Sequence, residues 1–178
     1  MHDRAQFWSP LPDWVQVSLH ARGIDIAVVD PGSIWLVSGD IDAFAARRGA
    51  GETLGPRKPC SIGVYALRVA PDRILLVGGS NDIDASAANA PGCVATDVSD
   101  GFLIFEIRGE AAAEVMAQGS EYPLSHNTML PHESAMMQFA GLRVAVARRP
   151  DGWRLHIERP WAPALWQWLE AHIDRAKV

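Results

Sequence analysis

The chain has 178 residues, of which 48% are hydrophobic and 21% are charged, and its formal net charge is -5. This composition indicates a folded globular domain and argues against a disordered chain, and the scattered basic pairs of an acidic chain argue against nucleic-acid binding. No stretch approaches the roughly 18 apolar residues of a membrane-spanning helix, and no signal-peptide pattern follows the first residues, so we expect a cytoplasmic protein.

Residues 1–23 are expected to form an N-terminal arm, because Pro10 and Pro12 exclude a helix or a central strand at its start. Within the arm, residues 15–19 alternate between apolar and polar side chains and could form an edge strand. Regular elements follow from residue 24, punctuated by glycine, proline and aspartate. They are an apolar run at 24–29, a strand at 33–38, a helix at 41–49, strands at 61–69 and 73–77, and an alanine-rich helix at 82–89.

The second half of the chain is expected to repeat this order of elements. It contains a strand at 102–109, a helix at 110–118, strands at 135–139, 142–147 and 153–158, and a long helix at 160–175. The last helix has a proline in its first turn, where the missing backbone N–H does no harm.

Two pairs of segments also match in pattern between the halves. Residues 34–40 match residues 103–109 with an offset of 103 − 34 = 69 and a one-residue ambiguity, and residues 71–76 match residues 150–155 with an offset of 150 − 71 = 79. The longer loop at 122–133 accounts for the difference. We therefore predict an α+β fold of duplicated strand–helix–strand–strand–helix units, with antiparallel sheets and helices packed on one face. Residues 24–178 would form a single domain of two pseudo-repeats, at about 24–92 and 93–178.

No residue set in the sequence has the spacing of a metal site. His126, His132 and Glu133 lie in the longer loop, and His156 lies in a later strand, but their spacing is not one that metal ligands use. We interpret this loop as solvated. Cys60 and Cys93 lie outside any CxxC motif and are expected to be small buried thiols.

Acidic residues around the start of the strand at 102–109 are the best candidates for acid–base chemistry. Asp97, Asp100 and Glu106 could supply such a pair if a pocket shifted one pKa. The pattern Asp-x-x-Asp-Gly before a strand is more simply a turn in which aspartate accepts backbone N–H groups. Gly78-Gly79-Ser80 lacks the spacing of a phosphate-binding loop, and we expect no catalytic residue on this chain.

Tryptophans near the two ends are candidates for contact with a partner. The apolar face of the last helix, expected to be core, comprises Trp161, Leu165, Trp168, Leu169 and His172. Trp166 falls at the edge of that face, about 100° from its neighbour in the helix, and Trp8 and Trp14 lie on the arm. Because tryptophan is enriched at interface hot spots, we predict that Trp8, Trp14 and Trp166 touch a partner; alternatively, they fold back onto this domain.

Several of these segments together resemble a known family. Asp97–Gly101 followed by Ile107–Ala112 resembles the DVS…G…GP-A signature of the aminomethyltransferase-like fold, which includes the T-protein of glycine cleavage. Within that superfamily, the sequence is most similar to the gamma subunit of heterotetrameric sarcosine oxidase. The three stretches that carry this likeness are residues 71–78, 97–124 and 159–169.

Departures from the family pattern limit what the resemblance implies. Ser120 stands where the T-protein has the aspartate that acts on its folate substrate, and serine cannot serve as that carboxylate. The KGCYxGQE motif of the tRNA-modifying-like branch is absent, and the chain is about half the size of a T-protein. The resemblance therefore implies that the fold is retained without the folate chemistry.

The resemblance implies a non-catalytic structural subunit of a sarcosine oxidase-like flavoenzyme complex that oxidatively demethylates an N-methyl amino acid. This chain would carry no cofactor, while FAD, FMN, NAD and tetrahydrofolate would bind larger alpha- and beta-type subunits, joined by a small delta-type subunit in some complexes. Two alternatives stay open. The chain could be a free-standing folate- or pterin-binding protein of the same fold, or an enzyme that uses Asp97, Asp100 or Glu106.

Overall fold

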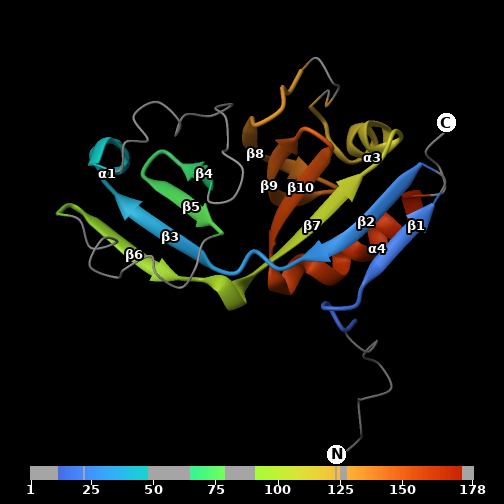
Figure 1. The fold of residues 1–178 in the computed structure, drawn as a ribbon, viewed down its shortest axis with the longest axis horizontal. Helices are drawn as coiled ribbons and strands as arrows, with labels where there is room; N and C mark the ends of the chain where they lie inside the picture. Colours follow the sequence, from blue (N-terminus) through green and yellow to red (C-terminus); the bar gives the residue numbers. More distant parts are fainter. Residues whose placement is uncertain are drawn as a thin grey trace, which may run out of the picture.

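The computed structural model describes residues 12–21, 23–47, 65–78, 91–122, 124 and 128–173 (Figure 1). The strands are β1 (Ser18–Ala21), β2 (Ile24–Val29), β3 (Ile34–Gly39), β4 (Tyr65–Ala70), β5 (Arg73–Val77), β6 (Cys93–Asp97), β7 (Phe102–Arg108), β8 (Ser134–Phe139), β9 (Leu142–Arg149) and β10 (Gly152–Glu158). The helices are α1 (Ile41–Arg47), α3 (Ala112–Gly119) and α4 (Ala162–His172), with short 3-10 turns η2 (Ser99–Gly101) and η3 (Arg159–Trp161). None of the described helices is long and apolar enough to cross a membrane.

The strands form two antiparallel sheets. A six-stranded sheet has the order β1-β2-β7-β10-β9-β8, and a four-stranded sheet has the order β4-β5-β3-β6. Helices α3 and α4 pack on one face of the six-stranded sheet, where Val115 and Leu165 share a core with Phe105. Helix α1 packs on the four-stranded sheet through Ile41 and Phe44. The predicted α+β fold, with antiparallel sheets and helices on one face of each, is confirmed.

The faces of the two sheets that carry no helix meet each other. Ile34 and Leu67 from the four-stranded sheet share a buried cluster with Ile104 and Ala145 from the six-stranded sheet. Successive side chains of a strand point to opposite faces of its sheet. The even-numbered residues of β7 and β10 therefore face this junction, while odd-numbered ones such as Phe105 join the core beneath the helices. This alternation decides which polar side chains come together at the junction.

Strand pairing is repeated between the two halves. The order β6-β3-β5-β4 corresponds to β2-β7-β10-β9. Ser38 of β3 pairs with Arg73 of β5, and Arg108 of β7 pairs with Gly152 of β10. The offsets between these pairs are 108 − 38 = 70 and 152 − 73 = 79, which agrees with the second sequence match, and the equivalent glycines Gly39 and Gly109 place the ambiguous match at 70. The strands β2 and β6 are exchanged between the sheets. Strand β2 precedes β3 in the chain but pairs with β7 in the six-stranded sheet, and β6 precedes β7 but pairs with β3 in the four-stranded sheet.

Two glycines occupy equivalent positions at the ends of β3 and β7. Gly39 has a φ of +120°, and a Cβ on it would lie 2.1 Å from the carbonyl oxygen of Gly92. Gly109 has a φ of +108°, and its Cβ would lie 2.1 Å from the carbonyl oxygen of Gly23. A side chain is excluded at both positions by the positive φ and by the close backbone. These contacts bring the exchanged strands against the ends of β3 and β7.

Some elements differ from the expectation. The edge strand runs over 18–21, not 15–19, so the end of the expected arm belongs to the six-stranded sheet. Strand β6 was not expected. The last helix is shorter than residues 160–175 and begins after a 3-10 turn. The helix expected at 82–89 lies outside the described residues, and the pseudo-repeat boundaries stay a prediction.

Candidate functional site

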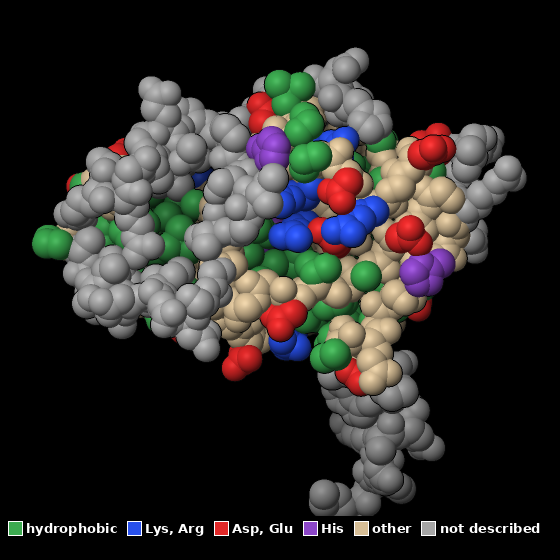
Figure 2. All heavy atoms as spheres, in the orientation of Figure 1, with side chains coloured by type: hydrophobic (Ala, Val, Ile, Leu, Met, Phe, Trp, Pro, Cys, Tyr) green, Lys and Arg blue, Asp and Glu red, His purple; other side chains and the backbone are tan. Residues whose placement is uncertain are grey.

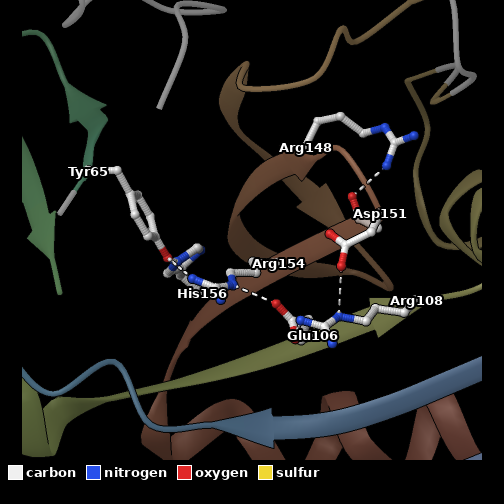
Figure 3. Close-up of polar contacts among 8 residues, drawn as sticks. Tyr65, Glu106, Arg108, Arg148, Asp151, Arg154 and His156 are labelled. Atoms are coloured by element: carbon white, nitrogen blue, oxygen red, sulfur yellow. Dashed lines mark hydrogen bonds and ion pairs between the residues drawn. The ribbon is translucent and has the colours of Figure 1, made fainter. Parts of the chain in front are cut away.

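Polar side chains converge where the four-stranded sheet meets the six-stranded sheet (Figure 3). Glu106 and Arg108 come from β7, and Arg154 and His156 come from β10, all on the face opposite to α4. Tyr65, the first residue of β4, reaches toward His156 from the other sheet. Figure 2 shows Lys and Arg side chains gathered at the centre of this face, with Asp and Glu side chains beside them. This cluster is the candidate site.

His156 is the most buried member of the cluster, with 1% of its surface exposed. Its Nδ1 lies 3.0 Å from the carbonyl oxygen of Ala145, which can only accept, so we assign the ring proton to Nδ1. Its Nε2 therefore accepts a hydrogen bond from the Tyr65 hydroxyl at 2.6 Å. Burial, with a smaller contribution from the charge on Arg154, lowers the pKa of His156 to about 4. The imidazole is therefore neutral at pH 7.

Glu106 is held between two arginines. Its Oε1 accepts from Nε of Arg154 at 2.8 Å, and its Oε2 lies 2.6 Å from the guanidinium of Arg108. Arg108 also contacts the carboxylate of Asp151 at 3.3 Å. Only 9% of the Glu106 side chain is exposed, whereas 52% of the Arg108 side chain is exposed. The buried carboxylate is thus charge-compensated from the two neighbouring strands.

The chemistry open to this cluster follows from these contacts. Both nitrogens of His156 and both oxygens of Glu106 have partners within this chain, and a proton added at Nε2 of His156 would displace the hydrogen bond from Tyr65. The bond between Tyr65 and His156 joins the two sheets, and the pair between Glu106 and Arg154 joins β7 to β10. These contacts stabilise the packing of the two sheets and the pairing of β7 with β10.

A small cavity lies beside His156 between the sheets. It has a volume of about 210 Å³ and includes Arg73, Arg143 and Glu158 among its lining residues. Pockets for drug-sized ligands and cofactors usually measure about 300 to 1,000 Å³. The cavity formed by the described residues is therefore small for a folate.

The acidic residues that the sequence singled out do not come together. Asp97 accepts hydrogen bonds from the backbone N–H and the hydroxyl of Ser99 at 2.9 and 2.6 Å, and the hydroxyl bond, followed by the backbone bond, lowers the pKa of Asp97. This is the predicted turn. Asp100 offers its backbone oxygen to Arg159. Asp97 belongs to the four-stranded sheet, whereas Glu106 belongs to the six-stranded sheet.

The longer loop of the second half has structural contacts where the structure describes it. Glu133 accepts a hydrogen bond from the backbone N–H of Leu130 at 2.8 Å. In the described part of the chain, no group of three or more His, Cys, Asp or Glu side chains could hold a metal ion. Ser120 accepts a hydrogen bond from the backbone N–H of Tyr122 at 3.1 Å. Cys93 is a free, buried thiol as expected, and His126, like Cys60, lies outside the described residues.

The tryptophans differ in burial. Trp166 is 6% exposed and stacks on Phe105 with ring centroids 5.8 Å apart, so it packs on its own sheet, as the alternative expectation has it, and its contact with a partner stays a prediction. Trp14 is half-buried, meets the same Phe105 ring edge-on, and keeps its predicted partner role. Trp8 lies outside the described residues.

The Tyr65–His156 contact could not be found from sequence spacing, because it joins residues far apart in the chain. The sequence does contain one indication of this cluster, because the polar residues Arg154 and His156 stand at alternate positions of an otherwise apolar strand. Charged residues that share one face of a predicted strand point to a common polar environment. Their partner on the other sheet depends on how the sheets pack.

The two exchanged, helix-backed antiparallel sheets define a fold that solved structures share, although a scan of protein-family models and a search of curated proteins gave no match to the sequence. One is the heterotetrameric sarcosine oxidase from Corynebacterium sp. U-96 in complex with pyrrole 2-carboxylate. The match to one of its chains has a TM-score of 0.72 and 20% identity, and covers 85% of this chain and 84% of that chain.

A second solved structure is the glycine cleavage system aminomethyltransferase T from Bartonella henselae. It matches with a TM-score of 0.63 and 17% identity over 83% of this chain, and this chain spans 45% of its length. The expected resemblance to the sarcosine oxidase and aminomethyltransferase fold is confirmed.

Proposed function

We propose that this chain is a non-catalytic, gamma-type structural subunit of a sarcosine oxidase-like complex that oxidatively demethylates an N-methyl amino acid in the cytoplasm. The observation that carries the proposal is the extent of the match. A chain of a heterotetrameric sarcosine oxidase is matched over 84% of its length, whereas the aminomethyltransferase is matched over 45%. A chain that matches most of one chain of an assembly supports a role in a similar assembly.

The engaged polar cluster supports a structural role. Both nitrogens of His156 and both carboxylate oxygens of Glu106 contact partners within this chain. In this proposal FAD, FMN, NAD and tetrahydrofolate bind larger alpha- and beta-type subunits, with a small delta-type subunit as a further partner. The substrate amine is chosen by those subunits.

Co-expression tests the proposal. The chain is produced with and without the flavin-bearing subunits encoded in the same genome, and the products are analysed by size-exclusion chromatography and for oxidation of N-methyl amino acids. We expect a stoichiometric complex whose yield or stability falls when this chain is omitted, and whose kcat/KM is unchanged by Glu106→Gln. A chain that stays a stable monomer beside a complete, fully active complex would contradict the proposal.

A further inference from the structure

An apolar groove lies where the described chain begins and where the 3-10 turn η3 leads into α4. It has a volume of about 580 Å³ and is lined by Pro12, Trp14, Asp100, Gly101, Arg159, Pro160 and Pro163. A second hollow of about 290 Å³ shares Trp14, Asp100 and Arg159 with it. We call the two together the proline groove.

Large apolar side chains stand exposed at the proline groove. Val15, which lines the second hollow, is 90% exposed, and Trp161, which follows the lining residue Pro160 in the chain but is not itself a lining residue, is 55% exposed. Single exposed apolar residues are common, but apolar residues gathered around a concave surface indicate a binding site. Tryptophan in such a place is typical of an interface hot spot.

The groove is supported from behind by aromatic packing. Trp14 meets Phe105 edge-on at 5.8 Å, and Trp166 stacks on the same ring. Proline side chains have almost no rotamer freedom to lose. A surface held in this way loses little conformational entropy on binding, which favours a stable contact.

The charges around the proline groove are mainly acidic. Asp30 and Asp100 line it and Asp13 stands beside it, all three exposed, while Arg159 is the one lining residue with a positive charge. A second copy that docked through the same face would bring like charges together, which is unfavourable. A partner with lysine or arginine beside its apolar residues complements this surface.

We propose that the proline groove docks an apolar segment flanked by lysine or arginine from a larger subunit of the complex. This inference rests on the proposed function, for which it names the surface and the chemistry of the partner segment.

The first experiment uses the complete chain and the co-expressed flavin-bearing subunits. Val15→Lys combined with Trp161→Lys adds positive charge and removes apolar area, so we expect at least a tenfold weaker association. Val94→Lys is the matched control, because Val94 is 63% exposed and lies on β6, away from the lining residues. All variants change exposed residues, and an unchanged Tm verifies that they are folded. Equal association of the double variant and the wild type would overturn the inference.

A second experiment does not depend on the complex. Two synthetic peptides of identical leucine and proline sequence, one flanked by lysines and one by glutamates, are titrated into the chain while its tryptophan fluorescence is recorded. We expect saturable binding of the lysine-flanked peptide only, lost in the double variant and retained in Val94→Lys. No binding of that peptide, or equal binding of both, would overturn the assigned partner chemistry.

The two experiments separate this inference from the proposed function. Peptide binding without assembly with the flavin-bearing subunits would refute the proposed function and the assigned source of the partner segment, while supporting the groove's chemistry. If the double variant assembles with the flavin-bearing subunits as well as the wild type does, the groove is not the docking surface, and the proposed function is unaffected. A wild-type dimer that the double variant dissociates would show that a second copy occupies the groove and would overturn the inference.

Discussion

Acid should destabilise this protein through one buried histidine. His156 is 1% exposed and has a pKa of about 4, because burial disfavours its charged form. In the unfolded chain its pKa should lie near the ordinary value of 6.5. Below pH 6.5 the unfolded chain binds a proton that the folded protein does not, so the free energy of unfolding falls as the pH falls. Above pH 6.5 both states are neutral and this contribution is fully present.

The size of the effect follows from the two pKa values. Each unit of difference is worth about 1.4 kcal/mol, so the loss accumulates between pH 6.5 and 4 to about 3 kcal/mol. That loss is a large fraction of the 5 to 15 kcal/mol that stabilises a typical domain. Below pH 4 both states carry the proton and His156 contributes no further change.

Urea unfolding at pH 7.5 and at pH 4.5, followed by tryptophan fluorescence, measures this loss. His156→Gln is the control, because glutamine can donate to the carbonyl of Ala145 and accept from Tyr65 without titrating. We expect the wild type to lose about 2 to 3 kcal/mol more than His156→Gln between the two pH values. If both proteins lose the same free energy, the assigned neutral state of His156 is wrong.

The other predictions concern the strand ends and the charge pairs. Gly39→Ala and Gly109→Ala should each lower the free energy of unfolding by about 2 kcal/mol or more, because a Cβ at either site meets a carbonyl oxygen at 2.1 Å in a positive-φ conformation; Gly101→Ala, where a Cβ meets nothing within 4 Å, should change it by less than about 0.5 kcal/mol in the same urea assay. Equal effects at all three sites would contradict this steric argument. Glu106→Gln should cost about 1 to 3 kcal/mol by leaving its two arginines without a carboxylate, whereas Asp151→Asn, at an exposed contact of 3.3 Å, should cost at most about 0.5 kcal/mol; the reverse order in urea unfolding would show that the buried pair is not stabilising.

Much of the fold was predictable because local patterns agree with the tertiary structure. The strand predicted at 73–77 is β5, and its turn at Pro71-Asp72 is where the two halves match in register. Strand β6 was missed because its sequence CVATD has little apolar alternation. It is a strand because it pairs along the whole of β3, which is information that lies elsewhere in the chain.

The candidate site was less predictable than the fold. Glu106 was singled out as a possible acid–base residue, but each of its carboxylate oxygens contacts an arginine of the same sheet. Trp166 packs on Phe105, which helical spacing did not indicate, because spacing gives an angle around the helix and not the width of the surface that the sheet covers. In both cases the role of a side chain depends on which residue packs against it, and spacing along the chain does not identify that residue.

The exchange of β2 and β6 constrains how the protein can be made. Strand β2 precedes every strand of the four-stranded sheet in the chain, but its neighbour β7 follows all of them. Strand β3 must likewise wait for β6 before its second edge is paired. Pairings between distant segments form slowly and leave edges open meanwhile. The four-stranded sheet therefore cannot be completed before β6 is available, and strand exchange couples the folding of the two halves.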